Sequence, residues 1–298
     1  MGNSGKDHSL KVDFYRVELS DTAEPLAEVM RGLIKRDVKE RTVDVGGALP
    51  HRLEELAAGQ YLEGNVLKIR MDDLPVRASV EKPGVQQIEI DDDEGIGEET
   101  AFFFAPRLQV IAIQRNRYGL GATPLCRYFR HFFRDQQEAM LFTQILTEDA
   151  QMKLEAIDEV RSFEMELAGS IGDFWQDRNV PMKVLGKLAT EADAPRVGIT
   201  LKMGHHKGGM NSGFLKSVAK AFMSVADVGG KLNRVSKLEI GGKVGPDETL
   251  IVDLISDRLV AEERFRSDVR GVLYAQRRTA VANGFRQHQK YLEKRFGK

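Results

Sequence analysis

The hydrophobic pattern of the chain changes repeatedly between strand-like alternation and helical spacing. In the strand-like segments, β-branched and aromatic residues alternate with polar ones. These segments are residues 11–19, 65–71, 100–105, 110–117, 161–167, 196–203 and 238–240. Helical spacing is found in residues 23–39, 51–58, 123 to about 160, 174–188, 214–225 and 257–296, and residues 250–255 begin either a strand or the last helix. The pattern predicts an α+β fold with mixed or antiparallel sheets, flanking helices and a long C-terminal helix.

The most specific local prediction is a hairpin followed by a helix. The strands 100–105 and 110–117 are separated by the four residues 106–109, which include Pro106, and this is turn chemistry. A glycine loop over 118–122 follows. Thr123 and Pro124 then form a good N-cap and first helical residue.

The length of 298 residues is enough for about two average domains. We expect a globular domain at residues 1–160, completed by the C-terminal segment 250–298. We expect residues 161–249 to form a second, smaller and mobile domain.

Composition narrows the class of protein. With 42% hydrophobic and 30% charged residues, the chain is expected to be globular and soluble. Its apolar runs are too short for membrane insertion, and its start has no hydrophobic core of a secretory signal. Cys126 is the single cysteine, so an internal disulfide framework and a multi-cysteine zinc site are excluded, which fits a cytoplasmic protein.

The net charge of −1 hides a segregation of charge along the chain. Residues 1–100 carry a net charge of −9, residues 101–140 carry +4 from arginines, residues 141–196 carry −5, and the remainder carries +9. Because a partner responds to the local field, basic stretches can form a positive face on a protein that is neutral in total. The alternative interpretation is that these stretches are only solvated surface.

Catalytic motifs are absent or incomplete. The segment 119–124 resembles a G-x-G-x-x-G loop, but Pro124 replaces the third glycine, and Phe214 stands where a P-loop needs its lysine. Asp247 and Asp253 begin a nuclease-like pattern, yet Ile255 occupies the lysine position. We therefore predict no catalytic residue, no metal and no cofactor, and lean against an enzyme.

Two basic loop-to-helix junctions are candidates for phosphate binding. In the first, arginines two apart on a strand precede the glycine loop, and arginines spaced three and four form one stripe of the next helix. They are Arg115, Arg117, Arg127, Arg130 and Arg134. Guanidinium groups suit phosphate geometry, and a helix N-terminus adds positive potential. The aromatic residues among them are more typical of core than of a base-stacking platform.

The second junction joins a strand, a glycine-rich loop and a helix. Its basic residues are Lys202, Lys207, Lys216 and Lys220. Glycines allow backbone amides to approach a polyanion closely, and Lys216 and Lys220 lie on one helix face. The alternative is a mobile loop beside a solvated helix.

Two segments resemble the RexA proteins of lambdoid phage exclusion systems. The first is TAFFFAPRLQVIAIQRNR with the following YGLGATPLCRYFRHFF, and the second is RVGITLKMGHHKGGMNSGFLKSVAKAFM. The glycine-rich loop is less basic here than in that family. The resemblance implies a two-domain homodimer that binds double-stranded DNA largely without sequence preference and acts in phage exclusion. It assigns DNA contacts to Lys202, Lys207, Lys216 and Lys220, whereas the arginine stripe rests on spacing.

These observations favour a non-enzymatic DNA-binding protein of bacterial antiphage defence, dimeric through its C-terminal helix. Two alternatives stay open. One is a nuclease-type effector subunit that works with a separately encoded partner, and the other is a scaffold whose basic surface binds an acidic protein.

Overall fold

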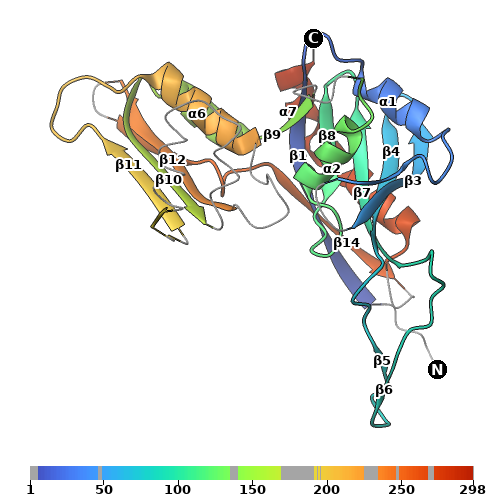
Figure 1. Cartoon of the computed structure of the whole chain (residues 1–298). Helices are drawn as coiled ribbons and strands as arrows, with labels where there is room; N and C mark the ends of the chain where they lie inside the picture. Colours follow the sequence, from blue (N-terminus) through green and yellow to red (C-terminus); the bar gives the residue numbers. More distant parts are fainter. Residues whose placement is uncertain are drawn as a thin grey trace. The chain divides into compact units, whose positions relative to one another are not determined.

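The computed structural model (Figure 1) describes residues 6–45, 49–134, 140–168, 191–192, 194, 196–224, 234–245, 248–267 and 272–297. By its packing the chain divides into two compact units. Unit 1 comprises Met1–Val12, Leu19–Met140 and Ala261–Lys298, and unit 2 comprises Asp13–Glu18 and Leu141–Val260. Residues 141–160 and 250–260 thus pack with the segment 161–249, whereas the sequence placed them in the first domain. That the chain has two domains that fold independently stays a prediction.

The larger sheet has the strand order β14-β1-β8-β7-β4-β3-β2, and β9 pairs with β1 beside this path. The pairings from β2 to β8 along it are antiparallel. The strands are β1 (Lys6–Leu19), β2 (Thr42–Asp44), β3 (Pro50–Ala58), β4 (Leu62–Arg70), β7 (Ile96–Ala105), β8 (Val110–Gln114), β9 (Met140–Gln144) and β14 (Val260–Ser267).

Helices cover both faces of this sheet in unit 1 (Figure 1). They are α1 (Leu26–Leu33), α2 (Ala122–Arg130) and α7 (Tyr274–Phe296). Successive residues of a strand face opposite sides: Phe102 packs edge-on against Phe129 of α2, with ring centroids 5.7 Å apart, and Phe103 stacks on Phe285 of α7 at 4.6 Å. The aromatic run of β7 therefore holds one helix layer on each side.

Unit 2 contains a four-stranded antiparallel sheet with the order β11-β10-β12-β13. Its strands are β10 (Glu159–Ala168), β11 (Arg196–Lys202), β12 (Arg234–Val244) and β13 (Glu248–Asp253), and the helices among its described residues are α3 (Glu148–Ala156) and α6 (Ser212–Ser224). Phe163 and Met165 share a buried cluster with Leu215, Ala219 and Phe222 of α6. Helix α6 therefore covers the sheet face on which Phe163 lies, as Figure 1 shows.

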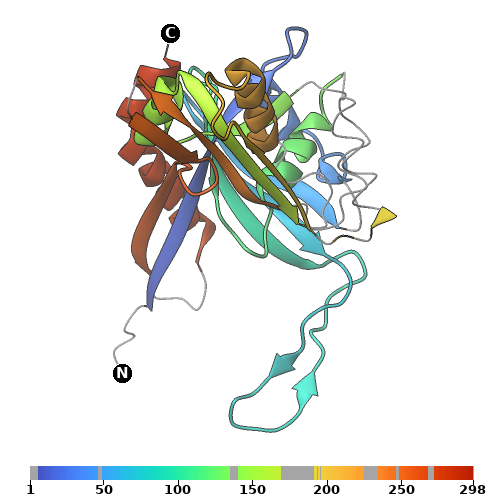
Figure 2. The same ribbon diagram turned by 90° about the vertical axis from the view of Figure 1, so that its left-hand side faces the viewer.

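A long arm connects β4 to β7 in unit 1. It contains the short antiparallel strands β5 (Arg77–Ala78) and β6 (Val85–Gln86). Both ribbon views show it extending past the end of the large sheet (Figures 1 and 2). This arm was not predicted from the sequence.

The predicted α+β class, with antiparallel sheets and a long C-terminal helix, is confirmed. The hairpin around residues 106–109 is also confirmed, as β7 and β8. The helix predicted at 51–58 is wrong, because this segment forms β3. Its Leu, Glu and Ala residues favour a helix locally, but pairing with both β2 and β4 overrides that preference.

Two long helices are shorter than predicted. Helix α2 ends at Arg130, and β9 and α3 follow within the segment to residue 160 that was expected to be helical. The expected helix 257–296 divides into β14 and α7. The helix expected at 174–188 lies outside the described residues. None of the helices in the described part of the chain is both long and apolar enough to cross a membrane.

Candidate functional site

Helix α2 is fixed to its surroundings by one buried tyrosine. The hydroxyl of Tyr128 donates a hydrogen bond to the Arg41 carbonyl oxygen and accepts one from the Leu53 amide, both at 2.7 Å. The side chain is fully buried, and the neighbouring Phe129 is buried against Phe102. These contacts determine which face of α2 packs against the sheet and which face is turned outward.

The outward face of α2 is cationic. Arg127 and Arg130 are half-buried, and Arg134 is exposed just after the helix end. Arg36, from the loop after α1, lies over the ring of Phe132 with its guanidinium carbon 5.4 Å from the ring centroid. We call Arg36, Arg127, Arg130 and Arg134 the α2 arginine surface. Within the part of the chain that the structure describes, its members Arg36, Arg127 and Arg134 form no ion pair.

Further positive charge lies around Tyr128. Burial raises the pKa of its hydroxyl far above the usual range, and the charges of Arg41, Arg52 and Arg36 oppose that rise. The phenol therefore stays protonated and able to donate to Arg41. Of these arginines, Arg52 is neutralised by Glu54, with its Nε 2.7 Å from the carboxylate.

Arg115 and Arg117 differ from the sequence-based expectation. The strand β8 ends at Gln114, so both arginines lie in the following loop and the argument that they share a strand face does not apply. The Arg115 amide donates to the Lys11 carbonyl at 2.7 Å. The Arg117 guanidinium lies 5.9 Å from the ring centroid of the exposed Tyr118.

The glycine loop before α2 is packed rather than open. The Leu120 amide donates to Thr100 Oγ1 at 2.8 Å, and the Asn116 side chain donates to the Glu99 carbonyl at 2.7 Å. A Cβ at Gly119 would collide with Thr100 Oγ1. The loop therefore holds the start of α2 against β7, and its glycine is explained by this close approach.

The second glycine loop is organised by Arg161 of β10. Its guanidinium donates to the carbonyl oxygens of Gly208 at 2.7 Å, His206 at 2.8 Å and Gly204 at 2.9 Å. The next helix, α6, is capped by the Asn211 side chain, which accepts a hydrogen bond from the Phe214 amide at 2.9 Å. Three carbonyl groups of the loop therefore point toward Arg161, and this part of the loop backbone stabilises the loop itself.

The four lysines of this junction are not brought together. Lys202 pairs with Glu164 at 2.9 Å, and strand alternation places both side chains on the sheet face opposite Phe163 and α6. On α6, Lys216 donates to the Ile157 carbonyl at 3.3 Å, and Lys220 pairs with Glu18 at 3.1 Å. Lys207 is exposed in the loop.

The face of the unit 2 sheet opposite α6 carries an ion-pair ladder. Glu164 accepts hydrogen bonds from Lys237 at 2.6 Å and from Lys202, and Lys237 also pairs with Glu239 at 3.3 Å. The hydrogen bonds from Lys237 and then Lys202 lower the pKa of Glu164 to about 2. Opposite charges alternate here, so Lys202 contributes to a balanced surface rather than a positive one.

The nuclease-like carboxylates do not form a centre among the described residues. Asp253 Oδ1 accepts the amides of Ile255 at 2.9 Å and Ser256 at 3.0 Å, so it caps the turn after β13. Asp247 lies outside the described residues. Over the described ranges, no three or more His, Cys, Asp or Glu side chains are grouped so that they could hold a metal ion.

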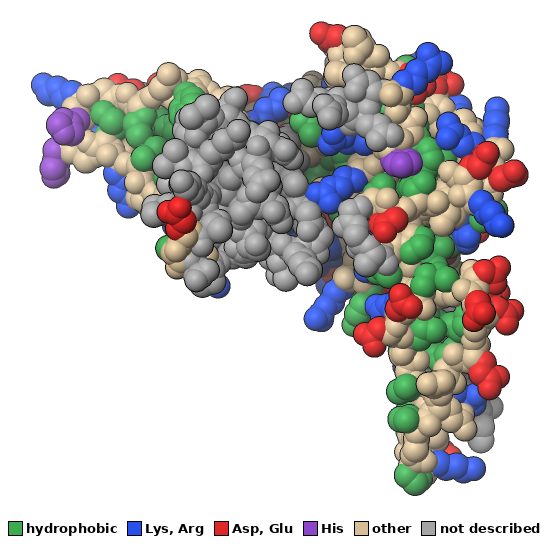
Figure 3. Space-filling model, viewed as in Figure 1, with side chains coloured by type: hydrophobic (Ala, Val, Ile, Leu, Met, Phe, Trp, Pro, Cys, Tyr) green, Lys and Arg blue, Asp and Glu red, His purple; other side chains and the backbone are tan. Residues whose placement is uncertain are grey.

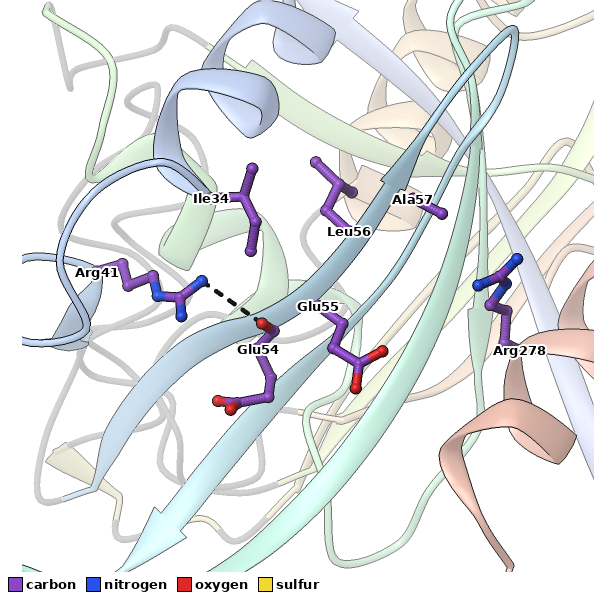
Figure 4. A pocket seen from close by; sticks show the side chains of 7 residues that line it. All are labelled: Ile34, Arg41, Glu54, Glu55, Leu56, Ala57 and Arg278. Atoms are coloured by element: carbon purple, nitrogen blue, oxygen red, sulfur yellow. Dashed lines mark hydrogen bonds between the residues drawn. The ribbon is translucent and has the colours of Figure 1, made fainter.

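A hollow of about 440 Å³ lies beside β3 in unit 1 (Figure 4). Its walls mix the charges of Arg41, Glu54, Glu55 and Arg278 with the apolar side chains of Ile34, Leu56 and Ala57. Arg278 is held by Glu63 at 2.7 Å. The hollow is shallow and its charges are balanced, so it carries no evident catalytic arrangement.

Two structurally important arginines were missed from the sequence. Arg36 lies in the acidic first third of the chain, where nothing marks it as a neighbour of Phe132. Arg161 lies more than 40 residues before the carbonyl groups that it binds. Both roles depend on tertiary contacts, which leave no local signal in the sequence.

A search of curated proteins gives no match to this chain. A family model matches residues 21–283, which span most of unit 1, including α2, and unit 2 from residue 141 onward. The family's description assigns no activity, so the resemblance to the RexA proteins stays a prediction. The chain belongs to the family of unknown function DUF6731.

Proposed function

We propose that this protein binds double-stranded DNA through phosphate contacts made by the α2 arginine surface. The observation that carries the proposal is the anchoring of α2. Tyr128 and Phe129 are buried on one side, so Arg127, Arg130 and Arg134 are turned outward, beside Arg36. Arg127 and Arg130 are thus presented on a helix held by the core, with Arg134 just after its end and Arg36 from the neighbouring loop.

The chemistry of this surface suits a nucleic-acid backbone. A planar guanidinium can bind phosphate through two parallel hydrogen bonds, and it loses little hydration compared with an ammonium group. Contacts of this kind fix the position of a duplex without reading its bases. The expected binding is therefore largely independent of sequence and requires no catalytic residue.

The lysine junction is the less suitable surface. Lys202, Lys216 and Lys220 each have a protein partner, so a phosphate would have to compete with a carboxylate or a carbonyl for them. Lys207 is the exception, because its exposed side chain has no ion pair or hydrogen bond to any residue in the described ranges. We include Lys207 as an accessory contact.

A role in antiphage defence, and action as a homodimer, extend this proposal. They rest on the resemblance of residues 100–133 and 196–223 to the RexA proteins. The first of these segments contains α2 and its arginines. Two members of the α2 arginine surface, Arg127 and Arg130, thus fall in the first of these segments.

The proposal is tested by fluorescence anisotropy with a labelled duplex of about 20–30 base pairs at low salt. Two variants with equal charge change are compared: Arg127→Gln with Arg134→Gln, and Lys202→Gln with Lys207→Gln. We expect the affinity of the arginine variant to fall at least tenfold, since removing an arginine that pairs with a phosphate weakens binding. The affinity of the lysine variant should fall less.

Unrelated duplexes of equal length should bind the wild-type chain alike. Absence of binding at about 50 mM salt, where phosphate contacts are strongest, would refute the proposal. Equal affinity of the arginine variant and the wild type would show that another surface is used. Circular dichroism of each variant confirms that the fold is retained.

A further inference from the structure

The arm between β4 and β7 makes little contact with the rest of unit 1. Every residue from 75 to 89 is exposed. The arm is held together by the pairs Arg77 with Gln86 and Ala78 with Val85, and it turns at Gly84, whose φ is +105°. A two-stranded hairpin without further packing is only marginally stable in water. We therefore expect the arm to pack against another protein surface when the protein functions.

The arm has a strong negative charge. Residues 71–95 contain eight acidic and two basic residues, which gives a net charge of −6. In Figure 3 the arm, at the lower right, shows acidic side chains with hydrophobic ones between them. Its field therefore attracts a cationic surface and repels nucleic acid.

Apolar side chains are also exposed on the arm. The exposed fractions are 54% for Val76, 104% for Val80, 68% for Val85 and 37% for Ile88. Ala78 and Val85 are directly opposed in the pair, and Val76 lies two residues before Ala78, so the three fall on one side. Apolar contact combined with opposite charge is the usual composition of a specific protein interface.

We propose that the arm of one copy of this chain docks on the α2 arginine surface of a second copy. The complementary charges are both in unit 1, with net −6 on the arm and four guanidinium groups beside α2. The exposure of residues 75–89 shows that the arm does not cover its own unit. About 12 residues on each side of the turn allow a reach of up to about 40 Å, which suffices to reach another molecule.

Such a contact is reciprocal. If the arm of each copy binds the other copy's arginines, the two contacts are equivalent and a closed two-fold dimer results. The interface differs from the C-terminal helix that the sequence suggested for dimerisation. It needs no DNA, but it uses the arginines that the proposed function assigns to phosphate, so DNA and the arm compete for the same surface and bound DNA displaces the arm.

The test is a charge exchange followed by sedimentation velocity of the full chain, without DNA. One variant carries Glu81→Lys and Glu89→Lys on the arm, and a second carries Arg36→Glu and Arg134→Glu beside α2. A third variant combines all four changes. All four side chains are exposed, and an arm with Gln86→Ala and Gln87→Ala serves as the neutral control.

We expect the wild type and the neutral control to sediment at twice the chain mass of 33.4 kDa at 50 mM salt. Each single-sided variant should sediment as a monomer, and the combined variant should recover the dimer because the attraction is restored with exchanged signs. Higher salt should weaken the wild-type dimer, since the Debye length falls to about 8 Å at 0.15 M.

Three results would overturn the inference. A monomeric wild type at 100 μM would exclude the dimer, and a dimer that both single-sided variants retain would exclude this interface. Failure of the combined variant to recover the dimer would exclude direct pairing of the two surfaces. The combined variant also separates the two proposals, because it should dimerise while its DNA affinity stays low.

Discussion

The anchoring of α2 predicts that removing a single hydroxyl group will destabilise unit 1. In Tyr128→Phe the ring keeps its place, but the Leu53 amide loses its acceptor and the Arg41 carbonyl loses its donor. The Tyr128 side chain is fully buried, so water does not readily replace the hydroxyl.

The expected cost follows from these two unsatisfied groups. A buried polar group that loses its only partner costs about 1–3 kcal/mol. Part of the cost is recovered by small shifts, so we expect the free energy of unfolding to fall by about 2–4 kcal/mol. If exchange requires unfolding of this unit, the Leu53 amide should then exchange about 30 to 1,000 times faster, because 1.4 kcal/mol corresponds to a factor of ten.

Hydrogen exchange at Leu53 and urea denaturation followed by circular dichroism measure the two quantities. Tyr118→Phe is the matched control, because Tyr118 is exposed and its hydroxyl has no partner within the described residues. The control should change stability by less than about 0.5 kcal/mol. An unchanged Leu53 exchange rate in Tyr128→Phe would refute the argument that this hydroxyl anchors α2.

Two further changes test the surroundings of the site. Glu164 has a lowered pKa, so its pairing with Lys237 and Lys202 stabilises unit 2 above about pH 4.5, and this contribution is lost as the pH falls toward 2. Thermal melts of Glu164→Gln should show a smaller loss of stability over that interval than the wild type, and parallel curves would contradict the pairing. Gly119→Ala should cost about 1–3 kcal/mol in urea denaturation, because its Cβ would collide with Thr100, and a neutral effect would show that the loop can shift.

The local patterns that were predicted correctly share a physical basis. The aromatic run at residues 102–104 alternates between two covered faces, and the turn at 106–109 has its own sequence signature, so the β7–β8 hairpin could be identified from local information. Helix α2 was located by Thr123 and Pro124 and by the spacing of its buried aromatics, but the predicted N-cap is wrong, because the helix begins at Ala122 and its N-cap is Gly121. Arg127 and Arg130 lie on this helix as the spacing predicts, whereas Arg134 follows the helix end.

Other elements depend on contacts far apart in the sequence. Residues 51–58 have helical composition, yet Leu53 and His51 are buried as strand residues between β2 and β4. The segment 257–296 was predicted as one helix from the helical spacing of its apolar residues, whereas residues 260–267 form β14 at the other end of the sheet order from β2. Propensity is a weak guide when non-local pairing decides.

The prediction of phosphate-binding residues was limited in the same way, because the two glycine loops form tertiary contacts that the sequence does not reveal. Both were expected to lie at phosphate-binding junctions, the first through arginines and a helix N-terminus and the second through lysines and loop amides. In the loop before α2, the Leu120 amide is bound to Thr100. In the loop before α6, three carbonyl groups accept hydrogen bonds from Arg161. The arginines that we propose for binding lie instead on and beside α2, and one of them, Arg36, comes from a loop that the sequence did not connect with this helix.

The salt dependence of DNA affinity tests the central claim most directly. If the four guanidinium groups of the α2 arginine surface and the accessory Lys207 contact phosphates, a plot of log affinity against log salt concentration should have a slope of about −4.5, since each of these contacts contributes about −0.9. In Arg127→Gln with Arg134→Gln the slope should become shallower by about 1.8. The same plot for Lys202→Gln with Lys207→Gln should differ from the wild type by no more than the one accessory contact, about 0.9. A slope that is unchanged in the arginine variant, or one that falls only in the lysine variant, would contradict the account.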